Sequence, residues 1–218
     1  MKDRNHSKSQ KQSVSKEDFC RFSHLLYDRY LVSGSGGNLS VRVGEKIFVT
    51  PSACSLRDME PSMVVAMDMD GGVLEGAMPT KDVELHLGIL RERADIHVVS
   101  HVHGAYIVAV STLIDPGPDV LPPLTPGFVY FVHPLAMIPF MIPGTGALSE
   151  ATIEQFRNPE CFALLLRNHG LVTVGRNFQE ALNLAEEVEE VARIYLLTNG
   201  KARPIPEEEV REIKKLKP

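Results

Sequence analysis

Cysteine is scarce in this 218-residue chain, and its three cysteines, Cys20, Cys54 and Cys161, are widely separated. That spacing fits neither a disulfide framework nor a CxxC metal site, so we expect three reduced thiols. Long apolar runs are also missing, because no segment approaches the roughly 20 consecutive apolar residues that a membrane span needs. The chain opens with Met1 to His6 and continues with polar residues rather than the apolar core of a signal peptide. We therefore expect a soluble, cytoplasmic protein with no membrane partner.

An excess of positive charge is absent too. The formal net charge is -5 and the sequence pI is about 5.9, so we expect no nucleic-acid partner. Residues 1–15 contain few apolar side chains to offset the entropy of ordering, which predicts a flexible N-terminal tail. Hydrophobic residues make up 44% of the chain, enough for a sizeable core, and we expect residues 16–218 to form a single domain.

Two histidines one residue apart, His101 and His103, follow a run rich in β-branched and apolar residues. On an extended strand, alternate residues face the same side, so both imidazoles can bind one ion. His169 follows a second apolar run, 162–166, and we expect it to complete the site from another strand. A single histidine in a strand is more often a hydrogen-bonded polar group than a ligand. Three neutral nitrogen donors with an open fourth position nevertheless predict a catalytic Zn²⁺ site, with another divalent cation as the alternative.

The hydrophobic periodicity predicts central strands flanked by helices. We expect helices at 16–30 (capped by Ser15), 79–93, 105–113, 149–157 and 178–198, and strands at 39–43, 46–50, 64–69, 95–103, 129–132, 137–140, 162–166 and 171–174, with a loop at 116–126. This order of elements predicts a three-layer α/β/α domain.

Three short segments are rich in hydrogen-bond donors. The glycine-rich segment 34–38 follows a helix and opens a strand, which is the reverse of a dinucleotide-binding loop. It is either an anion cradle or simply a turn that ends the helix. Together with segments 50–53 and 79–81, the last at a helix N-terminus, it favours a phosphate site. The residues predicted to bind the phosphate are Gly37, Asn38, Ser52, Ala53, Thr80 and Lys81.

Asp82 is the remaining candidate for chemistry. We expect it in the first turn of its helix, where a carboxylate also favours the helix dipole, so a purely structural role stays open. His86, one helical turn later, either orients this carboxylate or packs the helix against the sheet, and we favour packing.

Five ordered segments resemble the class II aldolase/adducin family, and the resemblance covers roughly Asp18 to Leu197. The segments are Gly36-Gly37-Asn38-Leu39-Ser40-Val41-Arg42, Thr50-Pro51-Ser52, Pro79-Thr80-Lys81-Asp82 with Leu85-His86, His101-Val102-His103 and Asn168-His169-Gly170. The resemblance implies a mostly antiparallel sheet in a three-layer α/β/α domain, and zinc on the three histidines. It also implies phosphate at the three donor-rich segments and a homotetramer with active sites at subunit interfaces.

The resemblance assigns proton transfer to Asp82, where the family normally has glutamate, one methylene longer. The tyrosine that the family's aldolases take from a neighbouring subunit has no clear match, since the nearest positions are 125–127 with Tyr130 beyond them. Lys81, together with 124–126 and 203–205, resembles the 3-oxo-tetronate 4-phosphate decarboxylase branch more than the L-fuculose-phosphate aldolase branch.

The resemblance thus implies a zinc-dependent lyase that cleaves a carbon–carbon bond of a phosphorylated sugar or sugar acid through a metal-stabilised enediolate. Aldol cleavage of the L-fuculose-phosphate type is the first expectation and decarboxylation the alternative. A third possibility is a non-catalytic, adducin-like interaction module, against which the presence of all three histidines argues.

Overall fold

The computed structural model describes residues 14–216, so most of the tail expected at 1–15 lies outside the described residues. The first helix, α1 (Lys16–Asp28), begins where the sequence predicts, because the Ser15 hydroxyl accepts the Asp18 N–H and the Asp18 carboxylate accepts the Ser15 N–H. This reciprocal capping box satisfies two backbone donors at the helix start. The helix ends two residues before the position we predicted, and Tyr30, with φ 58°, is 85% exposed rather than on its buried face.

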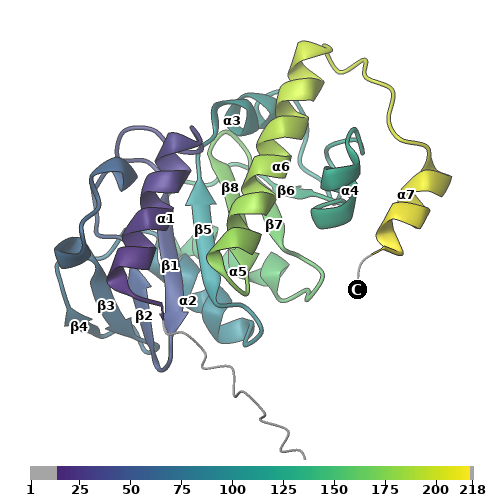
Figure 1. Ribbon diagram of the computed structural model, residues 1–218. Coiled ribbons are helices and arrows are strands. Elements are labelled where there is room, and N and C mark those ends of the chain that lie inside the picture. The colour runs from purple at the N-terminus through teal and green to yellow at the C-terminus, as the bar shows by residue number, and fades with distance from the viewer. Residues whose placement is uncertain (1–13, 217–218) are drawn as a thin grey trace, which may run out of the picture.

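The described residues form one eight-stranded mixed sheet in the order β4-β3-β2-β1-β5-β8-β7-β6 (Figure 1). Neighbouring strands are antiparallel except for the parallel pair β6 and β7. The strands are β1 (Asn38–Val43), β2 (Lys46–Val49), β3 (Val65–Asp68), β4 (Val73–Glu75), β5 (Val98–Val102), β6 (Ala136–Ile138), β7 (Ala163–Leu166) and β8 (Gly170–Gly175). The mostly antiparallel sheet is thereby confirmed.

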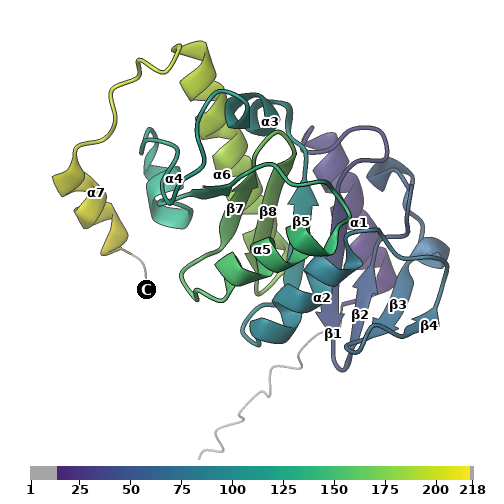
Figure 2. The ribbon, with the colours of Figure 1, turned by 180° about the vertical axis from the view of Figure 1, so that it is seen from behind.

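Helices cover both faces of the sheet. On one face lie α1, α3 (Ala105–Ser111) and α6 (Phe178–Leu197), and on the other lie α2 (Val83–Glu92) and α5 (Gly146–Phe156) (Figures 1 and 2). Each face has its own buried apolar cluster, one containing Phe19 and Val188 and the other containing Leu87 and Phe156. The three-layer α/β/α architecture is confirmed.

The strand predicted at 129–132 is wrong, because this segment belongs to α4 (Pro126–Phe131). The Thr125 hydroxyl accepts the Phe128 N–H, and Pro126 occupies the first turn, where its missing N–H costs nothing. These start signals outweigh the β-branched residues that follow. Strand β4 and helix α7 (Glu207–Lys214) were not expected, and two short 3-10 helices, Leu56–Asp58 and Pro61–Met63, complete the described elements.

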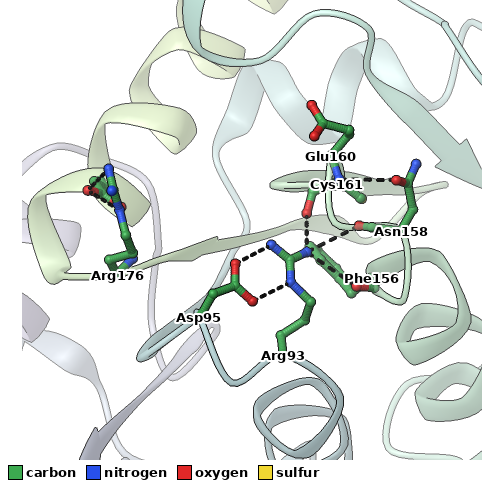
Figure 3. Close-up of polar contacts among 8 residues, drawn as sticks. Arg93, Asp95, Phe156, Asn158, Glu160, Cys161 and Arg176 are labelled. Atoms are coloured by element: carbon green, nitrogen blue, oxygen red, sulfur yellow. Dashed lines mark hydrogen bonds and ion pairs between the residues drawn. The ribbon is translucent and has the colours of Figure 1, made fainter. Parts of the chain in front are cut away.

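A buried guanidinium joins the end of α2 to the loop after α5 (Figure 3). Arg93 is 4% exposed and donates to the carbonyl oxygens of Phe156, Asn158 and Cys161 at 3.1–3.3 Å. Its other two nitrogens bind both carboxylate oxygens of Asp95 at 2.8 Å, and these hydrogen bonds lower the pKa of the Asp95 carboxyl. Arg93 therefore supplies a donor to three carbonyl groups near the end of a helix, of which that of Asn158 also accepts the Cys161 N–H at 3.0 Å.

Within residues 14–216, no helix is both long enough and apolar enough to span a bilayer.

Candidate metal centre and active site

The three histidines singled out by the sequence lie together at one end of the central strands. The Nε2 atom of His101 is 2.9 Å from that of His103 and 3.2 Å from that of His169. The ligand nitrogens of the three residues, one from each ring, all lie within 4.8 Å of one another. Two nitrogens bound at 2.0–2.1 Å to one tetrahedral ion are about 3.3 Å apart. The cluster therefore has the dimensions of three ligands that share a small cation.

His101 lies in β5, and His103 directly follows Val102, the last residue of that strand. His169, however, does not lie on a strand as expected: it belongs to the tight turn between β7 and β8. The preceding Asn168 has φ 55°, and the His169 N–H returns to the carbonyl of Leu166 at 3.1 Å. Asparagine tolerates this left-handed conformation better than most residues. The turn brings the His169 imidazole over the end of β5, which a continued strand would not do.

The protonation of the cluster suits a metal. The Nδ1 atom of His101 lies 3.1 Å from the Leu171 carbonyl oxygen, which can only accept, so Nδ1 carries the proton and Nε2 keeps its lone pair. Burial lowers the pKa of His103 to about 4 and also lowers the pKa values of His101 and His169. Three neutral imidazoles with converging lone pairs are the donor set that zinc and similar divalent cations prefer. The residues present therefore fit a metal.

The glycines near the cluster make room for it. A Cβ atom on Gly36 would lie 2.7 Å from Nδ1 of His103, and one on Gly170 would lie 2.7 Å from Cδ2 of the same ring. Both distances are shorter than ordinary carbon contacts. The glycine-rich segment 34–38 therefore does more than end a helix, because its backbone lies directly against a candidate ligand.

Asp82 stands beside the cluster but just outside its helix. We expected Asp82 in the first turn of α2, but it is the N-cap residue of that helix. Its side chain makes no capping hydrogen bond. Its carboxylate Oδ2 instead accepts a hydrogen bond from Nδ2 of Asn38 at 2.8 Å. The negative charge of Asp82 raises the pKa values of His103 and His169 against the effect of burial, which places the carboxylate within electrostatic reach of both rings.

His86 packs α2 against the sheet, as favoured above, but it is also part of a hydrogen-bonded chain that the sequence did not reveal. Its Nε2 lies against Oδ1 of Asn38, and its Nδ1 lies 2.8 Å from Oγ of Ser40. Both bonds join residues more than 40 positions apart, so no local pattern signals them. Only the side-by-side placement of Ser40 and Asn38 on alternate positions of β1 could have suggested it.

The donor-rich segments are joined to one another by backbone hydrogen bonds. The Thr80 N–H donates to the Thr50 carbonyl at 3.0 Å, and the Ser52 N–H donates to the Met78 carbonyl at 2.9 Å. The Thr50 N–H donates to the Leu39 carbonyl at 3.0 Å, which ties both segments to the start of β1. These bonds make segments 50–53 and 78–81 neighbours of each other and of the start of β1, and Lys81 and Ala53 are exposed.

The fold and the site define a class of protein, a three-layer α/β/α domain with a three-histidine cluster near an acid. The sequence of residues 17–196 matches the protein family described as "Class II Aldolase and Adducin N-terminal domain", so the chain belongs to this family.

Two curated relatives carry different activities in their names. The 3-oxo-tetronate 4-phosphate decarboxylase of Haemophilus influenzae is 30% identical over 204 residues, covering 92% of this chain and 96% of its own. The L-fuculose phosphate aldolase of Methanocaldococcus jannaschii is 33% identical over 184 residues, covering 84% of this chain and 97% of its own.

Solved structures agree on the fold. YgbL from Escherichia coli superposes with a TM-score of 0.86 at 28% identity, covering 91% of this chain and 97% of its own. An L-fuculose 1-phosphate aldolase superposes with a TM-score of 0.80 at 28% identity, covering 94% and 98% of the two chains. The curated relatives named above are thus a decarboxylase and an aldolase of this family.

Proposed function

We propose that this chain is a divalent-metal-dependent lyase that breaks a carbon–carbon bond in a phosphorylated sugar or sugar acid. The observation that carries the proposal is the convergence of the His101, His103 and His169 Nε2 atoms beside the Asp82 carboxylate. Three protein ligands leave a coordination position for substrate, as in catalytic rather than structural zinc sites.

The three histidines would hold the ion, Zn²⁺ being the best match to an all-nitrogen donor set. When bound, the metal supplies Lewis acidity, which polarises a substrate carbonyl and stabilises the negative charge released by bond cleavage. The Leu171 carbonyl accepts the Nδ1 proton of His101, which leaves the Nε2 lone pair of that ring free to bind an ion.

Asp82 is the proton-transfer group in this proposal. A carboxylate beside the metal can take a proton from a substrate carbon or return one to it, which typically contributes about 10²- to 10⁴-fold to the rate. The Asn38 N–H at 2.8 Å holds the carboxylate in place. Because Asn38 uses one N–H for Asp82, its second amide N–H is left for a substrate oxygen.

The phosphate lies, in this proposal, against the segments that contain Gly37, Ser52 and Thr80. The hydroxyl groups of Ser52 and Thr80 are brought together by the backbone hydrogen bonds between residues 50 and 80 and between residues 52 and 78. Ala53 adds a backbone N–H in a left-handed turn of φ 56°, and Lys81 supplies the positive charge. Backbone donors and an ammonium are the usual partners of phosphate oxygens.

Aldol cleavage and decarboxylation are the two candidate reactions. Aldol cleavage needs a second base for the hydroxyl proton of the departing aldehyde, whereas carbon dioxide leaves without a proton. The decarboxylase of Haemophilus influenzae matches 204 residues of this chain, against 184 for the aldolase of Methanocaldococcus jannaschii. The longer match favours decarboxylation as a serious alternative to the aldolase activity that we expect first.

The decisive experiment incubates zinc-loaded protein with L-fuculose 1-phosphate, L-ribulose 5-phosphate and 3-oxo-tetronate 4-phosphate. Aldol cleavage would give dihydroxyacetone phosphate and lactaldehyde from L-fuculose 1-phosphate, or dihydroxyacetone and glycolaldehyde phosphate from L-ribulose 5-phosphate. Decarboxylation of 3-oxo-tetronate 4-phosphate would give dihydroxyacetone phosphate and carbon dioxide. We expect one metal ion per chain in the wild type, loss of metal in His103→Ala, and retention in His97→Ala, a control on the same segment. Unchanged metal content in His103→Ala would contradict the ligand assignment.

A homotetramer with active sites at subunit interfaces is part of the same proposal. Large apolar side chains are exposed on the single chain, with Leu113 at 68%, Phe140 at 55% and Ile142 at 68% exposure. Association would remove such surface from water. Light scattering of the metal-loaded protein at micromolar concentration should give four times the chain mass, and a monomer would contradict this part of the proposal.

A further inference from the structure

A chain of hydrogen-bonded side chains leads from the middle of the sheet to the Asp82 carboxylate. Ser40 and His86 are 0% exposed and Asn38 is 6% exposed. The distances are 2.8 Å from Ser40 Oγ to His86 Nδ1 and 2.8 Å from Asn38 Nδ2 to Asp82 Oδ2, with the His86 Nε2 bond to Asn38 Oδ1 between them. Asp82, half-buried, is the acid of the chain, and its charge acts on His103 and His169.

The direction of every bond in this chain follows from its last member. An ionised carboxylate can only accept, so the Asn38 amide must turn its nitrogen toward Asp82 and its oxygen toward His86. That oxygen can only accept, so His86 carries its proton on Nε2. Its bare Nδ1 then accepts the hydroxyl proton of Ser40. This arrangement gives each of the three side-chain bonds one donor and one acceptor, and in it the amide of Asn38 cannot flip.

Packing alone does not account for a histidine at this position. The other buried residues of α2 are all apolar: Leu85, Leu87, Ile89 and Leu90. Burying a polar side chain costs free energy that its hydrogen bonds only offset, and an apolar residue of similar volume serves a core equally well. The neutral form fits the arrangement, since burial lowers the pKa of His86 to about 4.

The backbone brings the same chain close to the candidate metal ligands. Asn38 pairs directly with His101 across the β1–β5 ladder. Asp82 has no capping bond to its own helix, and the Asn38 amide is the side-chain donor that the structure gives it. The position of the carboxylate relative to the histidines therefore depends on how firmly the Asn38 amide is held.

We propose that His86, backed by Ser40, is a positioning residue that acts through Asn38 to aim the Asp82 carboxylate at the reacting carbon. This inference rests on the proposed function, in which Asp82 transfers the proton. It extends the active site by two residues that touch neither metal nor substrate. Small misplacements of a catalytic group can cost about a hundredfold in rate, so the effect of losing such a residue is measurable.

The first test compares His86→Leu with Leu90→Ala, a control that removes buried volume from the same helix without touching the hydrogen-bonded chain. We expect His86→Leu to lower kcat about 10- to 100-fold, with KM and metal content little changed. Leu90→Ala should lower thermal stability but not kcat. His86→Gln, which can keep an N–H toward Asn38, should recover part of the lost kcat, and it serves if His86→Leu fails to fold. Equal kcat in wild type, His86→Leu and His86→Gln would overturn the proposal.

A double-mutant cycle separates positioning from a general structural role. In an Asp82→Asn background, loss of His86 should lower kcat no further, because the group that it positions has already been removed. An equal loss of kcat in both backgrounds would overturn the proposal while leaving the assignment of Asp82 intact. No effect of Asp82→Asn on kcat would instead overturn the proposed function.

A readout without catalysis completes the test. The imidazole ¹⁵N shifts of His86 should report a neutral ring protonated on Nε2, in the metal-loaded and the metal-free protein alike. Crystal structures of the wild type and of His86→Leu should show the Asn38–Asp82 bond in the first and a rotated amide or carboxylate in the second. A ring protonated on Nδ1, or an unchanged Asp82 in the variant, would overturn the proposal even if no substrate is turned over.

Discussion

Asn38 and His101 are direct partners across the β1–β5 ladder, although they are 63 positions apart in the sequence. This one pairing joins the two halves of the candidate site. Asn38 carries the side chain that holds Asp82, and His101 is the central member of the histidine cluster. The register of the central strands therefore determines the distance between the acid and the metal ligands.

The close approach of Gly36 to the His103 ring gives the first prediction. A Cβ atom at Gly36 would lie 2.7 Å from Nδ1, so Gly36→Ala should displace the ring and weaken metal binding roughly tenfold. Gly146→Ala is the matched control, because a Cβ atom there meets nothing within 4 Å. Zinc titration with a competing chelator measures both affinities. Equal affinities in the two variants would contradict the prediction and show that the loop moves aside without displacing the His103 ring.

Local sequence signals predicted most of the fold but not the connections within the site. The Ser15 cap and the strand before His101 were predictable because their signals are short-range. The placement of His169 on a turn and the Asn38–Asp82 bond depend on how distant segments pack. The bonded pair is 44 residues apart, and side-chain hydrogen bonds of that kind leave no periodic pattern in the sequence. Candidate residues could thus be named in advance, whereas the hydrogen bonds of Asp82 could not.

Lys81 provides a prediction about substrate binding. It is exposed at the start of α2 beside the segment that contains Ser52, where it can meet a phosphate. Because a charge-assisted contact is worth about 1.5–3 kcal/mol, Lys81→Met should raise KM for a phosphorylated substrate by at least about tenfold. Its kcat should change much less. Lys46→Met, which removes an exposed charge from β2, is the control, and a rise in KM there of the same size would point to general electrostatic attraction instead.

Arg93 provides a prediction about stability. Replacing it with alanine removes a charged donor from three carbonyl groups near the end of α5, so Arg93→Ala should lower the free energy of unfolding by about 3 kcal/mol. Arg93→Lys should recover only part, since an ammonium lacks the planar fork that reaches Asp95 and the carbonyls together. Arg21→Ala, at an exposed pair with Asp18, should change the value by less than about 0.5 kcal/mol. Urea denaturation measures all three, and a small loss in Arg93→Ala would contradict the role.

The buried His86 predicts how stability depends on pH. Its pKa is lowered from 6.5 to about 4 by burial, so between these values the unfolded chain binds the proton more readily. The contribution of neutral His86 to the free energy of unfolding is therefore complete above pH 6.5 and is lost as the pH falls toward 4. At about 1.4 kcal/mol per pH unit, metal-free wild type should lose about 2 kcal/mol more than His86→Gln between pH 7.5 and 5. Parallel stability curves for the two proteins would contradict a neutral, buried His86.

The last prediction concerns Asp82, the acid held by the Asn38 amide near the histidine cluster. If Asp82 transfers the proton, an amide in its place cannot act as the base. Asp82→Asn should therefore lower kcat by about 10²-fold or more while the metal stays bound. Glu84→Gln, two residues later and exposed, is the control and should leave kcat unchanged. A carboxylate that only favours the helix dipole contributes about 0.3 to 1 kcal/mol to stability and nothing to turnover.

Asp82→Glu then separates the two candidate reactions. The Asn38 N–H fixes the carboxylate at a distance suited to aspartate, so glutamate must extend further toward the histidines or abandon that bond. A gain in aldol cleavage would show that the short acid limits an aldolase site. A loss of decarboxylation, with no gain in aldol cleavage, would show that Asn38 and Asp82 together set the reach of the acid for that reaction. If kcat is indifferent to both Asp82→Asn and Asp82→Glu, Asp82 transfers no proton.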